Sequence, residues 1–406
     1  MSGRFPYAMM NVLGGFMTSL KKLPLGLQDF AEIIESGCLY IDKTAYIHRL
    51  VTTSKLNFLS RPRRFGKSVL LSTFEALFRG RRELFQGLYI AERWDWTPFP
   101  VIRLDMLGIE SHNVAVLAEN LNERLDEQAL IHGVVLTKKR APNRFRELIL
   151  ALAQRGQVVV LIDEYDKPIL DHIVNSKRVK ANKQFLATFY AVLKSVETKL
   201  RFLFLTGVSK FTQVSLFSEL NNLMDLTLHS GYAGIAGYTE DEVNRDLSPY
   251  LAQPIDGLDG DRLRDKIRTW YNGYSWDGKT RVYNPVSLLN LLEQRRFGSF
   301  WFSTGTPKFL LELIRVGNLK VPDLDRIEIE EFSMQGFDPE KIDPISLLFQ
   351  TGYLTIQGID KDDMGDTYFL GYPNLEVKRA FLTLLADYSS GSNRPNQEKG
   401  LCRCLA

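Results

Sequence analysis

Residues 57–71, which read NFLSRPRRFGKSVLL, constrain the fold of this chain more than any other stretch. An apolar run is followed by a basic loop, and Gly66, Lys67 and Ser68 then open a second apolar segment with helical spacing. This order is typical of a strand, a phosphate-binding loop and the first turn of a helix. The general motif has Gly where this chain has Arg61, so the loop needs support from a second motif.

The residue types in the loop suit an anionic polyphosphate. Backbone N–H groups and the positive end of the following helix attract the phosphates. Gly66 removes a Cβ where the backbone approaches the ligand, Lys67 reaches the outer phosphates and assists catalysis, and the Ser68 hydroxyl binds Mg²⁺. We predict that the nucleotide is contacted by Arg61, Pro62, Arg63, Arg64, Phe65, Gly66, Lys67, Ser68 and Val69.

The second motif, residues 157–168, reads QVVVLIDEYDKP. Residues 158–162 have the composition of a strand that is buried on both faces, and Asp163 and Glu164 follow directly. A buried carboxylate is costly without a partner or a metal, so both should emerge at the C-terminal edge of a sheet. We predict that Asp163 organises Mg²⁺ through water and that Glu164 polarises the attacking water. The alternative is an acidic turn that caps the next segment.

These two motifs, with YIDKT at 40–44, TGVSK at 206–210 and YNGY at 271–274, resemble the bacterial AAA-ATPase-like family. The resemblance extends from Leu23 to Phe381. It implies that an Arg at the position of Arg61 is usual. Family members commonly continue into a nuclease domain of the PD-(D/E)XK type, which we do not expect in this chain. Glu376-Val377-Lys378 is similar to a nuclease motif, but its neighbours predict a helix start.

Composition limits the class of protein. A chain of 406 residues can form two or three domains, and 45% hydrophobic with 24% charged residues is ordinary for a globular protein. The net charge of +3 gives no global electrostatic reason to bind nucleic acid. Three cysteines cannot form a disulfide framework, and no apolar run is long enough to cross a membrane. We therefore predict a cytoplasmic protein.

Strands and helices are expected to alternate, which predicts an α/β fold: a P-loop NTPase parallel sheet covered by helices, followed by a helical lid and a winged-helix-like module. The expected strands are 101–104, 158–162 and 201–208, and the expected helices are 114–130, 143–153, 182–200, 263–270, 285–294 and 307–316. The predicted divisions are a disordered extension (1–22), the ATPase core (23–232), the lid (233–318), the winged-helix-like module (319–385) and a polar tail (386–406).

Further candidate site residues are indicated by less specific sequence signals. In related ATPases the strand beside the two motif strands ends in a polar side chain that senses the γ-phosphate, a role open to Ser209 or Thr206; a simple turn is the alternative. Asp42 and Lys43 precede the phosphate loop and could close over the base, although Asp42 could instead cap a helix. The aromatic residues of YNGYSW at 271–276 are expected to serve packing.

Together these features predict binding of ATP with Mg²⁺ and its hydrolysis, with Glu164, Lys67 and Ser209 in catalytic roles. Two alternatives stay open. The first is a nucleotide-gated interaction switch with little turnover, and the second is the ATPase or targeting part of a nuclease system. A DNA or protein partner and a homo-oligomer are both compatible with the sequence.

Overall fold

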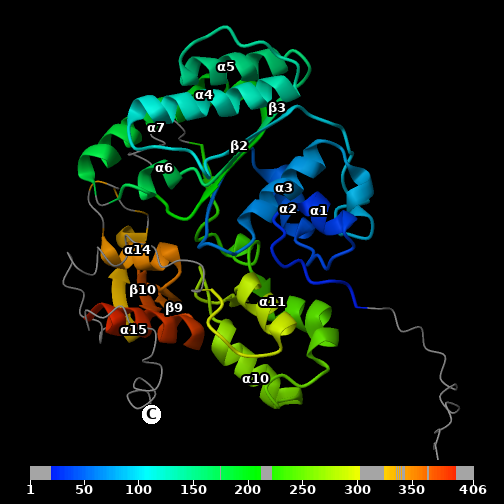
Figure 1. The fold of residues 1–406 in the computed structure, drawn as a ribbon, viewed down its shortest axis with the longest axis vertical. Coiled ribbons are helices and arrows are strands. Elements are labelled where there is room, and N and C mark those ends of the chain that lie inside the picture. Colours follow the sequence, from blue (N-terminus) through cyan, green and yellow to red (C-terminus); the bar gives the residue numbers. More distant parts are fainter. Residues whose placement is uncertain are drawn as a thin grey trace, which may run out of the picture.

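The computed structural model describes residues 20–173, 175–211, 222–301 and 324–389, except positions 335, 337, 339, 341, 342 and 364. Strands and helices alternate through the first half of the described chain (Figure 1). These elements are α1 (Phe30–Glu35), α2 (Thr44–Thr53), β1 (Leu56–Ser60), α3 (Lys67–Phe78), β2 (Val101–Asp105), α4 (Val114–Ile131), α5 (Ala141–Leu152), β3 (Val158–Asp163), α6 (Lys167–Leu170), α7 (Ser176–Ser195), β4 (Leu200–Gly207) and β5 (Met224–Asp225).

The five strands form one parallel sheet in the order β2-β3-β4-β1-β5. Strand β4 therefore lies between β1, which leads into the basic loop, and β3, which ends in the carboxylates. Ser60 pairs with Gly207 and Asp105 pairs with Asp163, so the strands end at similar levels. Because the carboxyl ends of parallel strands share one edge, the loops after β1, β3 and β4 meet there.

Side chains of the sheet alternate between two apolar clusters. Val159 and Leu161 pack with α3 on one face, whereas Val158, Val160 and Ile162 pack with α4, α5 and α7 on the other. Figure 1 shows α1, α2 and α3 on one side of the strands and α4, α5 and α7 on the other. Full burial of each aliphatic side chain stabilises the fold by roughly 1.5–3 kcal/mol. The α/β class predicted from the sequence is confirmed.

The chain after the sheet is mainly helical. Thr239 and Glu242 form a reciprocal capping box, as their spacing predicts. A third apolar cluster joins the helices of this part, including Leu263, Tyr271 and Leu288. The elements are β6 (Tyr238–Thr239), α9 (Glu240–Glu242), α10 (Gly260–Tyr271), β7 (Val282–Tyr283) and α11 (Pro285–Gln294). The helix expected at 307–316 lies outside the described residues.

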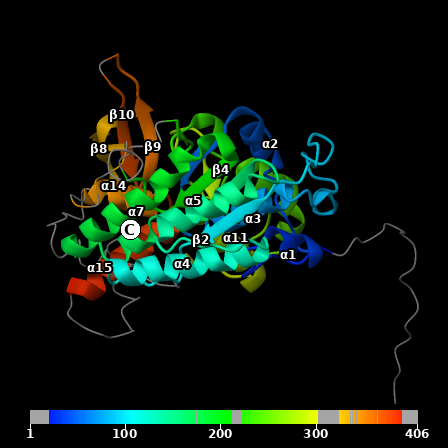
Figure 2. The same cartoon turned by 90° about the horizontal axis from the view of Figure 1, so that it is seen from above.

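The last described part contains a second sheet, which is antiparallel and has the strand order β8-β10-β9. The predicted sequence of helix, strand, turn and strand is confirmed, whereas β8 was not predicted. In Figures 1 and 2 this sheet and α14 lie on the side of the molecule opposite α1. Its elements are β8 (Ile327–Glu330), α13 (Glu331–Met334), α14 (Pro344–Thr351), β9 (Thr355–Asp360), β10 (Thr367–Gly371) and α15 (Leu375–Ser389). We call α14, β9, β10 and α15 the C-terminal module.

One helix differs clearly from the expected range. Helix α7 starts at Ser176 and ends at Ser195, whereas the sequence predicted 182–200. Asn175 caps its start by accepting the N–H of Arg178 at 3.1 Å. After Ser195, a 3-10 turn at Glu197–Lys199 leads into β4, whose first residue, Leu200, pairs with Val158 of β3. Pairing in the sheet therefore overrides local helical preference at this boundary.

Candidate functional site

The loop between β1 and α3 turns sharply at two positions. Arg64 and Gly66 have φ values of 71° and 83°, both in the left-handed region. A Cβ on Gly66 would meet no atom within 4 Å, so the backbone conformation, not lack of space in this structure, calls for glycine there. Helix α3 starts at Lys67, directly after this glycine. Its free N-terminal N–H groups therefore lie at the sheet edge.

Four predicted residues meet across this edge. The Ser68 hydroxyl donates to Oδ2 of Asp163 at 2.8 Å, which joins the first turn of α3 to the end of β3. Lys67 Nζ lies 3.9 Å from Oε1 of Glu164 and donates to the carbonyl of Pro62 at 3.2 Å. The two motifs are about a hundred residues apart in sequence, and the strand order brings them together.

The two carboxylates have different surroundings. Asp163 is buried, and burial raises the pKa of its carboxyl, while Lys67 and Ser68 act in the opposite direction. Glu164 is less buried and has a φ of 50°, an uncommon value for a non-glycine residue. Such strain is often found at functional sites. The site thus contains a buried carboxylate fixed by a hydroxyl and a less buried carboxylate, and both line one cavity.

A third carboxylate was missed as a site residue. Asp105 ends β2, pairs in register with Asp163 and lines the same cavity. Burial raises the pKa of Asp105, and the nearby charge of Glu164 adds to this increase. The sequence did show an acid at the end of this strand. Only the order of the strands shows that it lies beside the other two.

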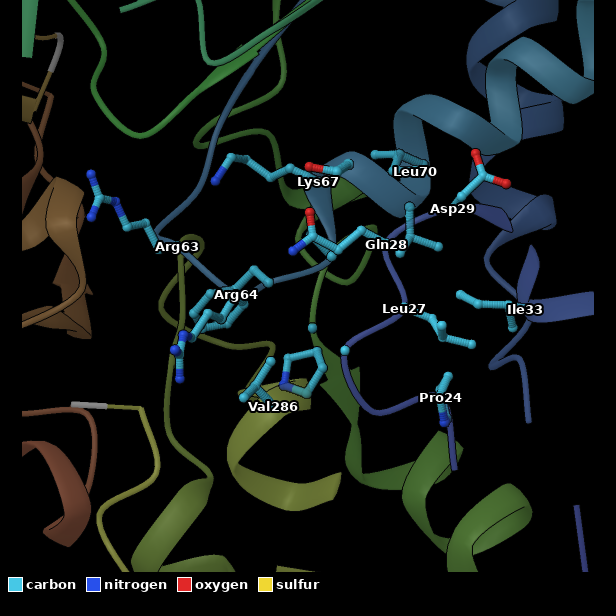
Figure 3. Close-up of a pocket in the computed structure, with 18 of the residues that line it drawn as sticks. Pro24, Leu27, Gln28, Asp29, Ile33, Arg63, Arg64, Lys67, Leu70 and Val286 are labelled. Atoms are coloured by element: carbon cyan, nitrogen blue, oxygen red, sulfur yellow. The ribbon is translucent and has the colours of Figure 1, made fainter. Parts of the chain in front are cut away.

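A cavity of about 840 Å³ extends from these groups; one end is polar, and the other is lined by apolar residues together with some polar ones. Arg63, Arg64, Lys67 and Ser68 line the polar end. Figure 3 shows Arg63, Arg64 and Lys67 on one side of the cavity and Pro24, Leu27 and Ile33 on the other. The apolar lining comes from residues 24–41, from α11 and from the 235–238 segment, and Gln28, Asp29 and Glu32 add polar groups to it. Phe65, Gly66 and Val69 of the predicted nucleotide-binding loop also line it.

Arg61 and Pro62 do not line this cavity. The Arg61 side chain is fully buried, donates to the carbonyls of Ser60 and Thr227 at 2.9 and 2.8 Å, and lies 4.0 Å from the centre of the Trp276 ring. Burial lowers the pKa of Arg61 to about 9. Its backbone N–H donates to Gly207. The placement therefore disagrees with the predicted nucleotide contact and assigns Arg61 to the fold of the loop, which explains why an Arg can replace glycine here.

The segment before β1 corrects a second expectation. Asp42 accepts the N–H of Thr44 at 2.7 Å and that of Tyr89 at 2.8 Å, and it does not line the cavity. The Asp42 carboxylate thus binds the first residue of α2, but Lys43 is the N-cap of this helix, so Asp42 lies one position before the cap that the sequence predicted. Lys43 lines the cavity, but its Nζ is bound to Glu242 at 2.5 Å and to the carbonyl of Gly234 at 2.8 Å. We assign both residues to the structure of this segment.

Thr206 lies near the end of β4, the strand between β1 and β3, and Ser209 follows this strand, but neither residue lines the cavity. The Thr206 hydroxyl donates to the carbonyl of Leu59 at 2.8 Å. The Ser209 hydroxyl is buried and has no hydrogen-bond partner among the described residues. A nucleotide sensor at Ser209 would therefore need the loop to move, and the present geometry does not itself place the hydroxyl at a phosphate.

Asp166 holds the loops after β3 and β4 together. Its Oδ2 accepts the backbone N–H groups of Val208 and Ser209 at 3.1 and 2.6 Å. A Cβ on Gly207 would lie 2.3 Å from Oδ1 of Asp166, so only glycine permits this approach. Burial and the charge of Glu164 raise the pKa of Asp166 to about 7. The role of Asp166 in joining the loops after β3 and β4 was not predicted.

Glu376 is buried near the phosphate loop, close to Arg64. It lies in the first turn of α15, which confirms the predicted helix start, and it accepts the N–H of Trp301 at 2.8 Å. Arg64 donates to the neighbouring carbonyl of Phe300 at 2.9 Å. Burial raises the pKa of Glu376 to about 7, and the charge of Arg64 acts in the opposite direction.

Glu376 is expected to make stability depend on pH. Between about pH 4.5 and about pH 7 the unfolded chain releases this proton while the folded chain keeps it, so the free energy of unfolding falls as pH rises through this window. Glu376→Gln cannot titrate and can still accept the Trp301 N–H. In urea unfolding at about pH 5 and about pH 8, the parent should lose on the order of 2–3 kcal/mol more than the variant. Equal losses would contradict this assignment.

The sheet order, the loop and the carboxylate strand together define a nucleotide-binding domain of the P-loop class. A family model described as "Predicted AAA-ATPase" matches residues 24–217. The chain is also 43% identical over 366 residues to a protein of Azotobacter chroococcum mcd 1 described as "Uncharacterized protein in vnfD 5'region", covering 89% of this chain and 69% of that protein. The chain therefore belongs to this AAA-ATPase-like family.

Comparison with solved structures adds little. The "Structure of the Aeropyrum Pernix ORC2 protein (ADPNP-ADP complexes)" aligns with 86% of this chain and 92% of its own, at 13% identity and a TM-score of 0.31. A TM-score this low supports no argument, so the fold is assigned from the strand order of the sheet. Among the described residues, no helix has the length and apolar character needed to cross a membrane.

Proposed function

We propose that this protein binds ATP with Mg²⁺ and hydrolyses it at the cavity between α3 and the ends of β2 and β3. The observation that carries the proposal is the hydrogen bond from Ser68 to Asp163, at the point where Lys67 approaches Glu164. Two different motifs thus supply a hydroxyl, an ammonium and two carboxylates to one cavity. Its volume of about 840 Å³ suits a nucleotide, since cofactor sites usually measure about 300–1,000 Å³.

The two ends of the cavity suit the two ends of ATP. The apolar lining from residues 24–41 and α11 would cover the base, and the polar end would hold the phosphates. Lys67, Arg63 and Arg64 supply positive charge there, and α3 presents its N-terminal N–H groups. Positioning and charge neutralisation dominate catalysis of phosphoryl transfer, and this arrangement supplies both.

The oxygen atoms of Ser68 and Asp163 fit Mg²⁺, which prefers oxygen ligands and is usually held by one or two protein groups together with phosphate and water. In the described residues, no group of three or more acidic, His or Cys side chains could hold a metal ion alone, so the nucleotide would complete the site. Bound Mg²⁺ would neutralise phosphate charge. Glu164 faces the cavity from β3 and would orient the attacking water.

Removal of Mg²⁺ tests the proposed metal site. Purified protein should bind ATP more weakly with EDTA than with Mg²⁺, and Asp163→Asn should weaken binding with Mg²⁺ by about tenfold, because a charge that organises the metal is lost. In EDTA the variant should approach the parent. Calorimetric titration measures all four affinities. A variant with parental affinity in Mg²⁺ would remove Asp163 from the metal site.

Turnover separates the proposal from its alternatives. Hydrolysis of ATP, measured with and without DNA, supports an ATPase, whereas tight binding with no hydrolysis above background supports a nucleotide-gated switch. Stimulation by DNA would favour the targeting part of a nuclease system. Cytoplasmic location, a DNA or protein partner, self-association, the domain boundaries and the winged-helix interpretation stay predictions.

A further inference from the structure

The segment Tyr271–Trp276, read as packing residues from the sequence, contacts the phosphate loop. The Phe65 ring lies 4.8 Å from the Tyr274 ring and 5.3 Å from the Trp276 ring, both edge to face. Trp276 also carries the Arg61 guanidinium on its face. We call residues 271–276 the bridging segment. Its aromatic side chains fix the loop at two positions on either side of Pro62 and Arg64.

The bridging segment is bound to the C-terminal module on its other side. The N–H of Ser275 donates to Oγ1 of Thr355 at 2.7 Å, and this hydroxyl donates to the carbonyl of Ser275 at 3.0 Å. The same carbonyl accepts the N–H of Ile356 at 3.4 Å. Thr355 and Ile356 begin β9. One short segment therefore joins the loop that would hold the phosphates to a strand of the module.

The module also contacts the phosphate loop directly. Gly352 ends α14 with a φ of 89°, and a Cβ added there would lie 2.8 Å from Cβ of Pro62. The carbonyl of Pro62 is the atom that accepts Lys67 Nζ. The side chain of Gln350 accepts the N–H of Lys210 at 2.8 Å, next to the loop after β4. The module thus touches the loops that follow both β1 and β4.

These contacts form a short physical path. A phosphate that draws Lys67 Nζ away from the Pro62 carbonyl would change the position of the Pro62 peptide, and the Pro62 ring has no free space against Gly352. We propose that the C-terminal module senses the nucleotide through Pro62 and the bridging segment, so that ATP binding and docking of the module are coupled. This proposal rests on the nucleotide binding proposed above.

A change in the module should therefore alter nucleotide affinity without touching the cavity. Gly352→Ala places a methyl group against Pro62 and is expected to change the Kd for a non-hydrolysable ATP analogue by about fivefold or more, the lower end of usual coupling. Gly365→Ala is the matched control, because Gly365 also has a positive φ, 135°, in the same part of the chain, but a Cβ there meets nothing within 4 Å. It should keep parental affinity.

Coupling is reciprocal, so the analogue should also change the module. In the parent, hydrogen exchange of the β9 and β10 amides should change when the analogue binds, and Lys67→Ala should abolish this change. The deciding variant of the affinity test is Gly352→Ala. If Gly352→Ala does not fold, the deciding variant is Thr355→Val, which removes both Thr355 hydrogen bonds to Ser275.

The outcomes are distinct. A parent that binds no ATP analogue overturns the proposed function and this proposal with it. The coupling alone is overturned if the parent binds the analogue, the deciding variant and Gly365→Ala bind it with parental affinity, and hydrogen exchange in β9 and β10 does not change on binding. Changed affinity in the deciding variant, with parental affinity in Gly365→Ala, supports it.

Discussion

Glu164→Gln is expected to leave ATP binding intact and to lower single-turnover hydrolysis by about 10²-fold or more, the usual contribution of a positioned general base. The amide keeps the shape of the side chain and its capacity to hydrogen bond but loses the charge that orients water. Binding is expected to survive because Asp163 and Ser68, not Glu164, make the contact across the sheet edge. Rapid-quench measurement of hydrolysis, with calorimetric affinity for the same samples, checks both expectations.

Asp171→Asn provides a matched control for this variant. Asp171 directly follows the short helix α6 and does not line the cavity, although its ion-pair partner Lys167, at 2.5 Å, does. Its substitution removes one carboxylate a few residues from Glu164, and the rate should stay parental. Parental hydrolysis by Glu164→Gln would show that another group orients the water, and Asp105 would then be the next residue to test.

Lys67→Ala is expected to weaken ATP binding at least tenfold. Charge-assisted hydrogen bonds contribute about 1.5–3 kcal/mol each, and ~1.4 kcal/mol corresponds to a factor of ten. Lys67 is buried at the polar end of the cavity, where its Nζ donates to the Pro62 carbonyl and lies 3.9 Å from Oε1 of Glu164. The ammonium group is therefore placed to donate hydrogen bonds to a phosphate. Calorimetric titration with ATP and Mg²⁺ measures the loss.

Lys55→Ala is the control for the lysine. Lys55 lies directly before β1, at the end of this strand away from the phosphate loop, and donates to the carbonyl of Glu197. The Lys55→Ala variant should bind ATP as the parent does. This result would separate loss of the phosphate contact from a general change in charge. Unchanged affinity in Lys67→Ala would remove this lysine from the nucleotide site.

Local patterns predicted the parts of the fold that depend on neighbouring residues. The apolar runs of β1 and β3, the strand at 101–105 and helix α11 follow directly from composition and periodicity. The capping box at Thr239 is also local, so its short motif identified it. The two-residue strand β5 gave no pattern, because it is too short for its alternation to differ from a loop.

The directions of side chains in the site depend on contacts between segments that are distant in sequence, so local patterns did not predict them. Arg61 was expected at the phosphates, but Trp276 and the carbonyls of Ser60 and Thr227 hold it in the core. Asp105 was known as the end of a strand, yet its place beside Asp163 depends on the order β2-β3-β4. Residue spacing indicates neither the burial of Arg61 nor the position of Asp105, since both arise from contacts between distant segments.

The sequence by itself determined the class of fold and the chemical groups of the candidate site: a phosphate loop ending in Gly66, Lys67 and Ser68, and a strand ending in Asp163 and Glu164. The tertiary structure alone decided which side chains face the cavity and that the C-terminal module rests on the phosphate loop through Gly352 and Pro62. The physical reason is that motifs and periodicity report a residue's near neighbours, whereas burial and close packing depend on segments that meet only when the chain folds.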